Sequence, residues 1–118
     1  MNDRYGHPTG DEVLRWFARI ISANMKGRDT VARYGGEEFA IILPQTTIEN
    51  ASMLAGQIKQ QLESQLWTKP GAPNTSLRVT ASFGVAQLGV NEGTSGLIQR
   101  ADAKLYESKS AGRNRVAA

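Results

Sequence analysis

Two β-rich runs meet at a pair of glycines in the first half of this 118-residue chain. Residues 30–34 and 37–43 are mainly apolar or β-branched, and only Gly35 and Gly36 separate them. A connection of two glycines is typical of a β-hairpin with a tight primed turn, because glycine readily adopts the positive φ angles of such turns. The sequence therefore predicts an antiparallel hairpin, which any fold proposed for the chain must accommodate.

Helical patterns flank the predicted hairpin on both sides. Residues 11–25 carry apolar side chains at three- and four-residue spacing, with Asp11 as the expected N-cap. Thr47 is expected to cap a second helix, whose buried stripe would extend to Leu66. A third helix is expected over residues 97–110. Three amphipathic helices therefore accompany the hairpin.

The remaining segments complete an α+β pattern. Residues 69–74 are rich in proline and glycine and predict a loop, residues 77–86 predict a strand, and Val116 is expected to begin a short last strand. The order α-β-β-α-β-α becomes the ferredoxin-like β-α-β-β-α-β when one strand is placed before it. We therefore expect residues 1–118 to be a single domain that begins inside a longer natural sequence and lacks its first strand.

Composition narrows the class of protein. Hydrophobic residues make up 40% of the chain and charged residues 21%, as in ordinary globular domains. The chain has no cysteine, which excludes disulfides and thiolate metal sites. No apolar run approaches the roughly 20 residues needed to cross a bilayer. The net charge of +3 fits both a plain basic surface and attraction of polyanions such as nucleotide phosphates, and charge alone does not choose between them.

Several sequence blocks resemble one known family. Residues 33–39, RYGGEEF, match the GGDEF signature in its GGEEF form, and residues 2–11, NDRYGHPTGD, resemble the ND-x-x-GH-x-x-GD block of the same family. Further matches follow in the family's order and spacing at residues 81–86, 100–106 and 109–114. The chain thus resembles, over essentially its whole length, the GGDEF domain that catalyses synthesis in diguanylate cyclases. The resemblance implies a nucleotidyl-cyclase-type palm, with a central antiparallel sheet flanked by helices.

Glu37 and Glu38 are the candidate catalytic and metal-binding residues. They follow two glycines, and Gly35 and Gly36 have no side chains, so a phosphate or sugar can approach the backbone closely. Paired carboxylates beside such a gap suit Mg²⁺, although an isolated sequence of this kind is also typical of a solvent-exposed acidic turn. The resemblance implies that Glu37 binds Mg²⁺ (or Mn²⁺) and helps to deprotonate the attacking 3′-hydroxyl, and that Glu38 assists at the metal.

The resemblance also implies an activity and its partners. Two GTP molecules would be condensed into cyclic di-GMP with release of two pyrophosphates, in a homodimer that brings two domains face to face. The rival functions are a catalytically silent module that binds GTP or cyclic di-GMP, and a structural dimerisation domain. We expect no nucleic-acid polymer as a partner and no membrane contact from this segment. The expected location is the cytoplasm, including the cytoplasmic part of a membrane-bound sensor.

Three residues near the N-terminus are candidate guanine and substrate contacts. Asn2 and Asp11 match the guanine-reading residues of the family: a carboxylate accepts from N1–H and the N2 amino group, and an amide donates to O6 or N7. The alternatives are a plain helix N-cap for Asp11 and a frayed terminus for Asn2. His7 lies between them, and substrate contact and a structural role are equally compatible with its position.

Lys109 and Arg113 are candidate phosphate contacts at the end of the last predicted helix. They are four residues apart, so they share a face if the helix continues that far. The resemblance implies that they grip the triphosphate, for which lysine and arginine are suited. The alternative is solvated charge that interacts favourably with the helix dipole.

Two departures from the family pattern affect these expectations. The Asp-x-Asp-x-Phe-Lys block that precedes Asn2 in the family is absent, so we expect residues 1–118 alone to turn over GTP poorly. The family's inhibitory Arg-x-x-Asp is here Lys26-Gly27-Arg28-Asp29, and Gln57 stands where a second arginine often lies. Arg28 could share a face with Lys26 along an extended segment but not along a helix. We therefore predict weak product inhibition through this site.

Overall fold

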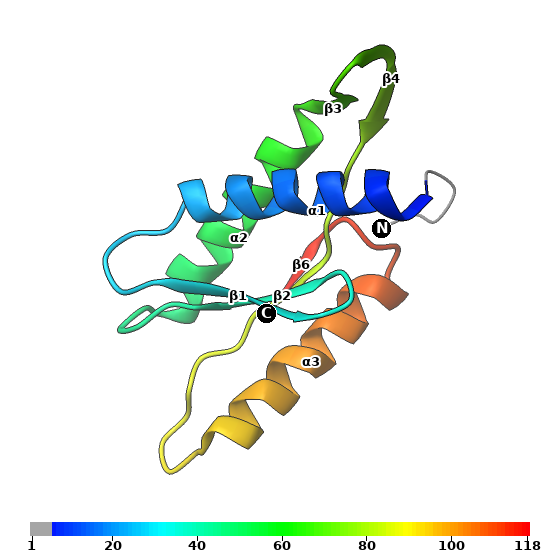
Figure 1. The fold of residues 1–118 in the computed structure, drawn as a ribbon. Helices are drawn as coiled ribbons and strands as arrows, with labels where there is room; N and C mark the ends of the chain where they lie inside the picture. Colours follow the sequence, from blue (N-terminus) through cyan, green and yellow to red (C-terminus); the bar gives the residue numbers. More distant parts are fainter. Residues whose placement is uncertain (1–5) are drawn as a thin grey trace. The chain divides into compact units, whose positions relative to one another are not determined.

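The computed structural model describes residues 6–118 (Figure 1). The elements in chain order are α1 (Gly6–Ala23), β1 (Thr30–Gly35), β2 (Glu38–Ile42), α2 (Ile48–Glu63), β3 (Leu66–Lys69), β4 (Ala72–Arg78), β5 (Phe83–Gly84), α3 (Thr94–Ser110) and β6 (Val116–Ala117). This order contains the expected α-β-β-α-β-α series and the short last strand, and it adds a second hairpin. None of the described helices is both long enough and apolar enough to span a bilayer.

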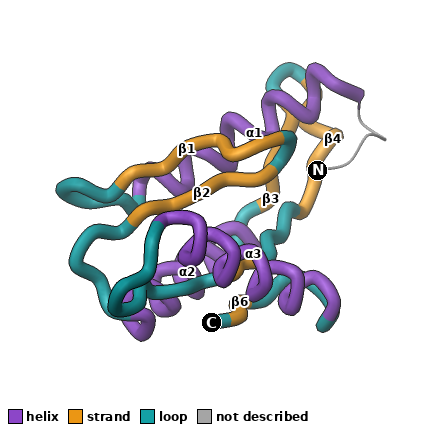
Figure 2. The backbone as a smooth tube through the Cα atoms, turned by 90° about the horizontal axis from the view of Figure 1, so that it is seen from below, coloured by secondary structure: helices purple, strands orange, loops and turns teal. Residues whose placement is uncertain are grey.

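The described residues form two compact units. The first unit contains the described residues up to Pro44 together with Gln61–Val79, and the second contains Gln45–Gln60 and Thr80–Ala118. Within residues 6–118 the strands pair two by two: β1 with β2 and β3 with β4 are antiparallel, whereas β5 and β6 are parallel. Figure 2 shows β1 and β2 running side by side as a long hairpin.

In the first unit, α1 buries the apolar stripe that the sequence predicts. Val13, Leu14, Phe17 and Ile21 are all buried, and the Phe17 ring contacts the ring of Phe39 on β2, with 5.2 Å between the ring centroids. These rings attach α1 to one face of the β1–β2 hairpin. The contact matters for the candidate site because Phe39 directly follows the two signature glutamates.

The N-terminal boundary of α1 corrects one expectation. The helix begins at Gly6, so Asp11 lies inside it and is not its N-cap. Pro8 falls in the first turn, where a missing N–H costs nothing because that group would have no helical partner. The helix therefore starts earlier than the apolar periodicity indicates. The expected cap of α2 is confirmed, since Thr47 Oγ1 accepts the N–H of Asn50 at 3.2 Å.

The β3–β4 hairpin was not anticipated from the sequence. Helix α2 ends at Glu63, so the expectation that Leu66 extends its buried stripe is wrong: Leu66 lies in β3 and is 54% exposed. Its neighbour Trp67 is 5% exposed, as expected when successive side chains of a strand point to opposite faces. The predicted loop at residues 69–74 is instead a tight turn, with Gly71 at φ 79°.

The single strand predicted over residues 77–86 is divided into two. Leu77 and Arg78 end β4 and pair with β3, whereas Phe83 and Gly84 form β5 and pair with β6. The two ends of this segment have different partner strands, and the residues between them pair with neither. The partner strands, which are not adjacent in sequence, thus decided where each strand ends.

In the second unit, α3 packs directly on β5. The Ser108 side chain is fully buried, and its Oγ donates to Phe83 O at 2.6 Å. A Cβ atom placed on Gly84 would lie 2.7 Å from Leu105 Cα, which is far inside van der Waals contact. The helix and strand therefore approach at backbone distance, and only glycine fits at position 84.

An ion pair holds the glycine-rich link that precedes α3. Arg100 Nη2 lies 2.5 Å from Glu92 Oε1, Arg100 Nε donates to Glu92 Oε2 at 2.8 Å, and Arg100 also donates to Gln87 O. Glu92 Oε1 in turn accepts the N–H of Gly89 at 2.8 Å. The hydrogen bond from Arg100, followed by that from Gly89, lowers the pKa of Glu92 to about 2.

Candidate functional site

The signature hairpin turns one residue later than the sequence predicts. Gly35 still belongs to β1 and pairs with Glu38, so Gly36 and Glu37 form the turn, with Gly36 at φ 45°. The expected Gly35–Gly36 turn is therefore wrong. The cause is a bulge: the register shifts after Arg33 pairs with Phe39, which leaves Tyr34 as the extra residue on β1.

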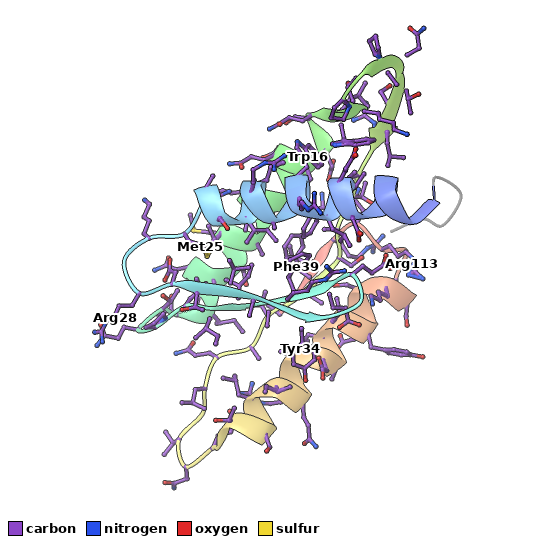
Figure 3. All side chains as sticks on the ribbon, viewed as in Figure 1. Trp16, Met25, Arg28, Tyr34, Phe39 and Arg113 are labelled. Carbon is purple, nitrogen blue, oxygen red and sulfur yellow. The ribbon has the colours of Figure 1, made fainter. Side chains whose placement is uncertain are left out.

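The bulge also separates the two faces of the hairpin near its tip. Figure 3 shows Phe39 on the side of the hairpin that faces α1 and Tyr34 on the other side, where it is 58% exposed. An inserted residue bends its strand and increases the local twist. It thereby moves Glu37 into the turn itself, whereas Glu38 begins β2.

Arg33 makes a contact that the sequence reasoning did not anticipate. Its Nε and Nη2 both donate to the carbonyl oxygen of Gly36, at 2.8 and 2.6 Å. Arg33 thus reaches from β1 around the bulge to the first residue of the turn. Its place three residues before Gly36 was the only sequence signal for this contact.

Glu37 and Glu38 fit a divalent cation that is also bound by a substrate. Both residues are exposed at the tip, where oxygen ligands suited to Mg²⁺ are accessible. No group of three or more histidine, cysteine, aspartate or glutamate side chains suited to a metal occurs in the part of the chain that the structure describes. The glutamate pair therefore suits the sparse protein coordination of Mg²⁺, which is completed by water and substrate phosphates.

The proposed base-reading residues lie on or before α1. Asp11 is exposed within the helix, in the same unit as the hairpin. Its position inside the helix removes the N-cap alternative and leaves its carboxylate in an exposed position on the helix surface. The backbone of His7 lies in the first turn of α1. Asn2 lies outside the described residues.

Lys109 and Arg113 belong to the second unit and do not share a helical face. Lys109 is in the last turn of α3, which ends at Ser110. Beyond it, Gly112 N donates to Lys109 O at 3.4 Å and Arg113 N donates to Ser108 O at 2.9 Å, with Gly112 at φ 120°. These two bonds form a Schellman cap. The condition that the helix continue to Arg113 is therefore not met.

The backbone at Arg113 is nevertheless fixed. Arg113 and Asn114 adopt φ angles of 63° and 49°, which are uncommon for residues other than glycine. Asn114 N donates to Ser82 Oγ at 3.1 Å, and Phe83 N donates to Arg115 O at 2.9 Å. The segment after α3 is thus held along β5 in a conformation of the kind that concentrates at functional sites.

The departed inhibitory motif forms a turn, which is neither of the geometries considered from the sequence. Asp29 N donates to Lys26 O at 2.9 Å, and Lys26 N donates back to Asp29 Oδ2 at 3.0 Å, with Gly27 at φ 54°. Lys26 and Arg28 are exposed, and Figure 3 shows Arg28 extending outward from this turn. One oxygen of Asp29 is already used within the turn.

Comparison with known proteins gives a consistent result. Residues 1–115 match the family model described as diguanylate cyclase, GGDEF domain. Diguanylate cyclase A of Treponema denticola is 41% identical over 117 residues, covering 98% of this chain and 31% of that protein. The response regulator PleD of Caulobacter vibrioides is 39% identical over 117 residues, covering 98% of this chain and 26% of that protein. The chain therefore spans only a minor part of the length of these relatives.

Solved structures match the fold closely. The GGDEF domain of DgcB from Caulobacter crescentus, in complex with c-di-GMP, has a TM-score of 0.92 and 36% identity, covering 98% of this chain and 68% of that one. The active GGEEF domain of a diguanylate cyclase from Vibrio cholerae has a TM-score of 0.86 and 32% identity, covering 98% and 72%. These similarities confirm the α+β, nucleotidyl-cyclase-type fold predicted from the sequence.

Proposed function

Because the chain belongs to the GGDEF domain family, we propose that it is the catalytic domain of a diguanylate cyclase, which condenses two GTP molecules into cyclic di-GMP. The observation that carries this proposal is the hairpin tip, where Gly35, Gly36, Glu37 and Glu38 are all retained within a family match that covers residues 1–115. Diguanylate cyclases of this family generally use divalent metal ions.

The reaction forms two phosphodiester bonds by the same step. The 3′-oxygen of one GTP attacks the α-phosphorus of the other, a new P–O bond forms, and the bond to pyrophosphate breaks. Glu37 is placed to take the proton of the 3′-hydroxyl, and Glu38 adds negative charge beside it. Mg²⁺ or Mn²⁺, held by these two carboxylates, would supply electrophilic stabilisation of the attacking and leaving oxygens. Most of the remaining catalysis is positioning of the two nucleotides.

Substrate recognition is assigned to residues from several elements. Asp11 accepts from guanine N1–H and the N2 amino group, and Asn2 and His7 complete the contacts to the nucleotide. Gly35 and Gly36 leave space for the ribose and phosphates. Two cations act on the triphosphate, namely Lys109 and Arg113. The fixed left-handed backbone at Arg113 supports this role, because it holds that residue in one conformation.

Each domain holds one GTP, so synthesis requires a homodimer with two domains facing each other. The rate per domain should therefore rise with protein concentration, and a rate independent of concentration in a monomeric sample would contradict the dimer. The DgcB domain was solved with c-di-GMP, and we extend that ligand to this chain as product and as a weak inhibitor at Lys26, Arg28 and Asp29. The proposed location is the cytoplasm, where GTP is available.

The test of the activity is product analysis in the full-length protein. Incubation with GTP and Mg²⁺ followed by chromatography should yield cyclic di-GMP. Glu37→Gln should abolish the product without lowering the melting temperature, because Glu37 is exposed in a turn. Glu49→Gln is the matched control: it makes the same change at an exposed glutamate in the first turn of α2 and should leave the rate unchanged.

Other outcomes identify the rival functions. Binding of GTP or cyclic di-GMP without any product would indicate a silent binding module. Dimerisation without nucleotide binding would indicate a structural role. Substantial activity in Glu37→Gln would show that the metal and base assignments at the hairpin tip are wrong.

A further inference from the structure

We propose that Arg33 is a positioning residue that sets the direction of the Glu37 carboxylate at the hairpin tip. The proposal rests on the proposed function, because it assigns a role in the same reaction. The Arg33 guanidinium donates twice to a single acceptor, the carbonyl oxygen of Gly36, from Nε at 2.8 Å and from Nη2 at 2.6 Å. Two donors on one planar group fix the direction of the acceptor as well as its distance.

The acceptor is the carbonyl that controls Glu37. A peptide unit is planar, so the Gly36 carbonyl, the Glu37 nitrogen and Glu37 Cα lie in one plane. Holding the Gly36 oxygen therefore fixes the orientation of the plane from which the Glu37 side chain departs. Gly36 itself, at φ 45°, has no side chain that could limit this rotation.

The contact lies where the β ladder is weakest. The regular register ends at the pair Arg33–Phe39, and the bulge at Tyr34 interrupts the pairing before Gly35 meets Glu38. A bulge leaves one residue unpaired and disrupts the ladder locally. The Arg33 side chain bridges this interruption, because its backbone lies before the bulge and its guanidinium binds beyond it.

The burial of Arg33 distinguishes positioning from a role in folding. Arg33 is exposed, and the first unit is held together by buried apolar side chains such as Phe17 and Ile21. Removal of an exposed hydrogen bond costs little stability. Misplacement of a reacting group by about 1 Å can cost as much as a hundredfold in rate. Arg33 should therefore influence the reaction much more than the stability of the fold.

The discriminating variant is Arg33→Lys, compared with Arg19→Lys, which makes the same change at an exposed arginine on α1. Lysine keeps the charge but cannot form the two-donor fork. In the full-length protein we expect kcat for cyclic di-GMP synthesis to fall by about ten- to a hundredfold in Arg33→Lys. KM for GTP should change by less than about twofold, since uniform substrate binding is retained. The melting temperature should stay that of the wild type, and Arg19→Lys should leave all three quantities unchanged.

Two further measurements do not require turnover. The Nε–H of Arg33 should exchange with solvent more slowly than that of Arg19 in NMR spectra, as expected for a held donor. Binding of Mn²⁺ to the protein with a non-reactive GTP analogue, followed by electron paramagnetic resonance, should be weaker in Arg33→Lys than in the wild type. Slow exchange together with weaker Mn²⁺ binding would support the proposal.

Other results would overturn it. A raised KM with unchanged kcat would mean that Arg33 contacts the triphosphate itself. A loss of activity that only follows a lower melting temperature would mean a structural role, and exchange as fast as at Arg19 would mean that the contact to Gly36 is not held. A wild-type protein that makes no cyclic di-GMP would overturn the proposed function instead, and the exchange and Mn²⁺ measurements would still decide the role of Arg33.

Discussion

Replacement of Gly84 by alanine should destabilise the second unit strongly. The added Cβ would lie 2.7 Å from Leu105 Cα and closer still to Leu105 N and Ala101 O. Carbon atoms pack at about 3.5–4.0 Å, so β5 and α3 would have to separate by about 1 Å. Overpacking of this kind typically costs about 1–3 kcal/mol, and the upper end is expected here because the obstacle is helix backbone. The separation would also weaken the bond from Ser108 Oγ to Phe83 O.

The matched control is the same substitution at Gly56. This glycine lies inside α2, and a methyl group added to it would have no heavy atom within 4 Å outside its own helical backbone and chain neighbours. Alanine is preferred over glycine in a helix interior by roughly 1 kcal/mol. The two substitutions therefore add the same methyl group with opposite expected effects on stability.

Thermal unfolding followed by circular dichroism measures both effects. A change of 1 kcal/mol shifts the melting temperature of a domain near this size by about 4 °C. Gly84→Ala should therefore lower the melting temperature by roughly 10 °C, and Gly56→Ala should raise it by about 4 °C. A Gly84→Ala protein that melts with the wild type would refute the close approach of α3 and β5.

Three further outcomes are expected. Asp11→Ala should weaken GTP binding by about tenfold, as loss of a charged hydrogen-bond partner typically does, and should reduce discrimination against ATP in competition assays; equal losses for both nucleotides would contradict guanine reading. The Glu92–Arg100 pair depresses the pKa of Glu92 from 4.5 to about 2, so its contribution is complete above pH 4.5 and is lost as the pH falls toward 2. Arg100→Gln should flatten the pH dependence of unfolding across that interval, and an unchanged profile would show that the pair contributes nothing. Lys26→Arg should strengthen inhibition by added cyclic di-GMP by about tenfold, because a guanidinium binds phosphate with two donors; tight wild-type inhibition that Lys26→Ala abolishes would show that lysine suffices.

The sequence alone determined the features that depend on local spacing. The three- and four-residue repeat of α1 placed Val13, Phe17 and Ile21 on its buried face, because a helix has 3.6 residues per turn whatever surrounds it. Thr47 was identified as the α2 cap from the chemistry of its hydroxyl and its position before the apolar stripe. The hairpin at residues 30–43 followed from two β-rich runs joined by glycines.

The residues that define the site also came from the sequence, through their order along the chain. Glu37 and Glu38 stand at the tip of a hairpin, as predicted, and Asp11 lies on the helix that packs against that hairpin through Phe17 and Phe39. What the spacing could not supply was the bulge at Tyr34. It moved the turn by one residue and depends on the pairing of two strands rather than on either one alone.

Tertiary contacts decided the remaining boundaries and packing. Leu66 continues the apolar spacing of α2, yet it begins a strand because residues 66–69 pair with Ala72–Arg78. Gly84 is required because Leu105, far along the chain, brings its backbone against β5. Arg113 leaves the helix because the segment after α3 bonds to Ser82 and Phe83 instead of extending the helix. In each case the deciding partner is distant in sequence, so its effect exists only once the chain has folded.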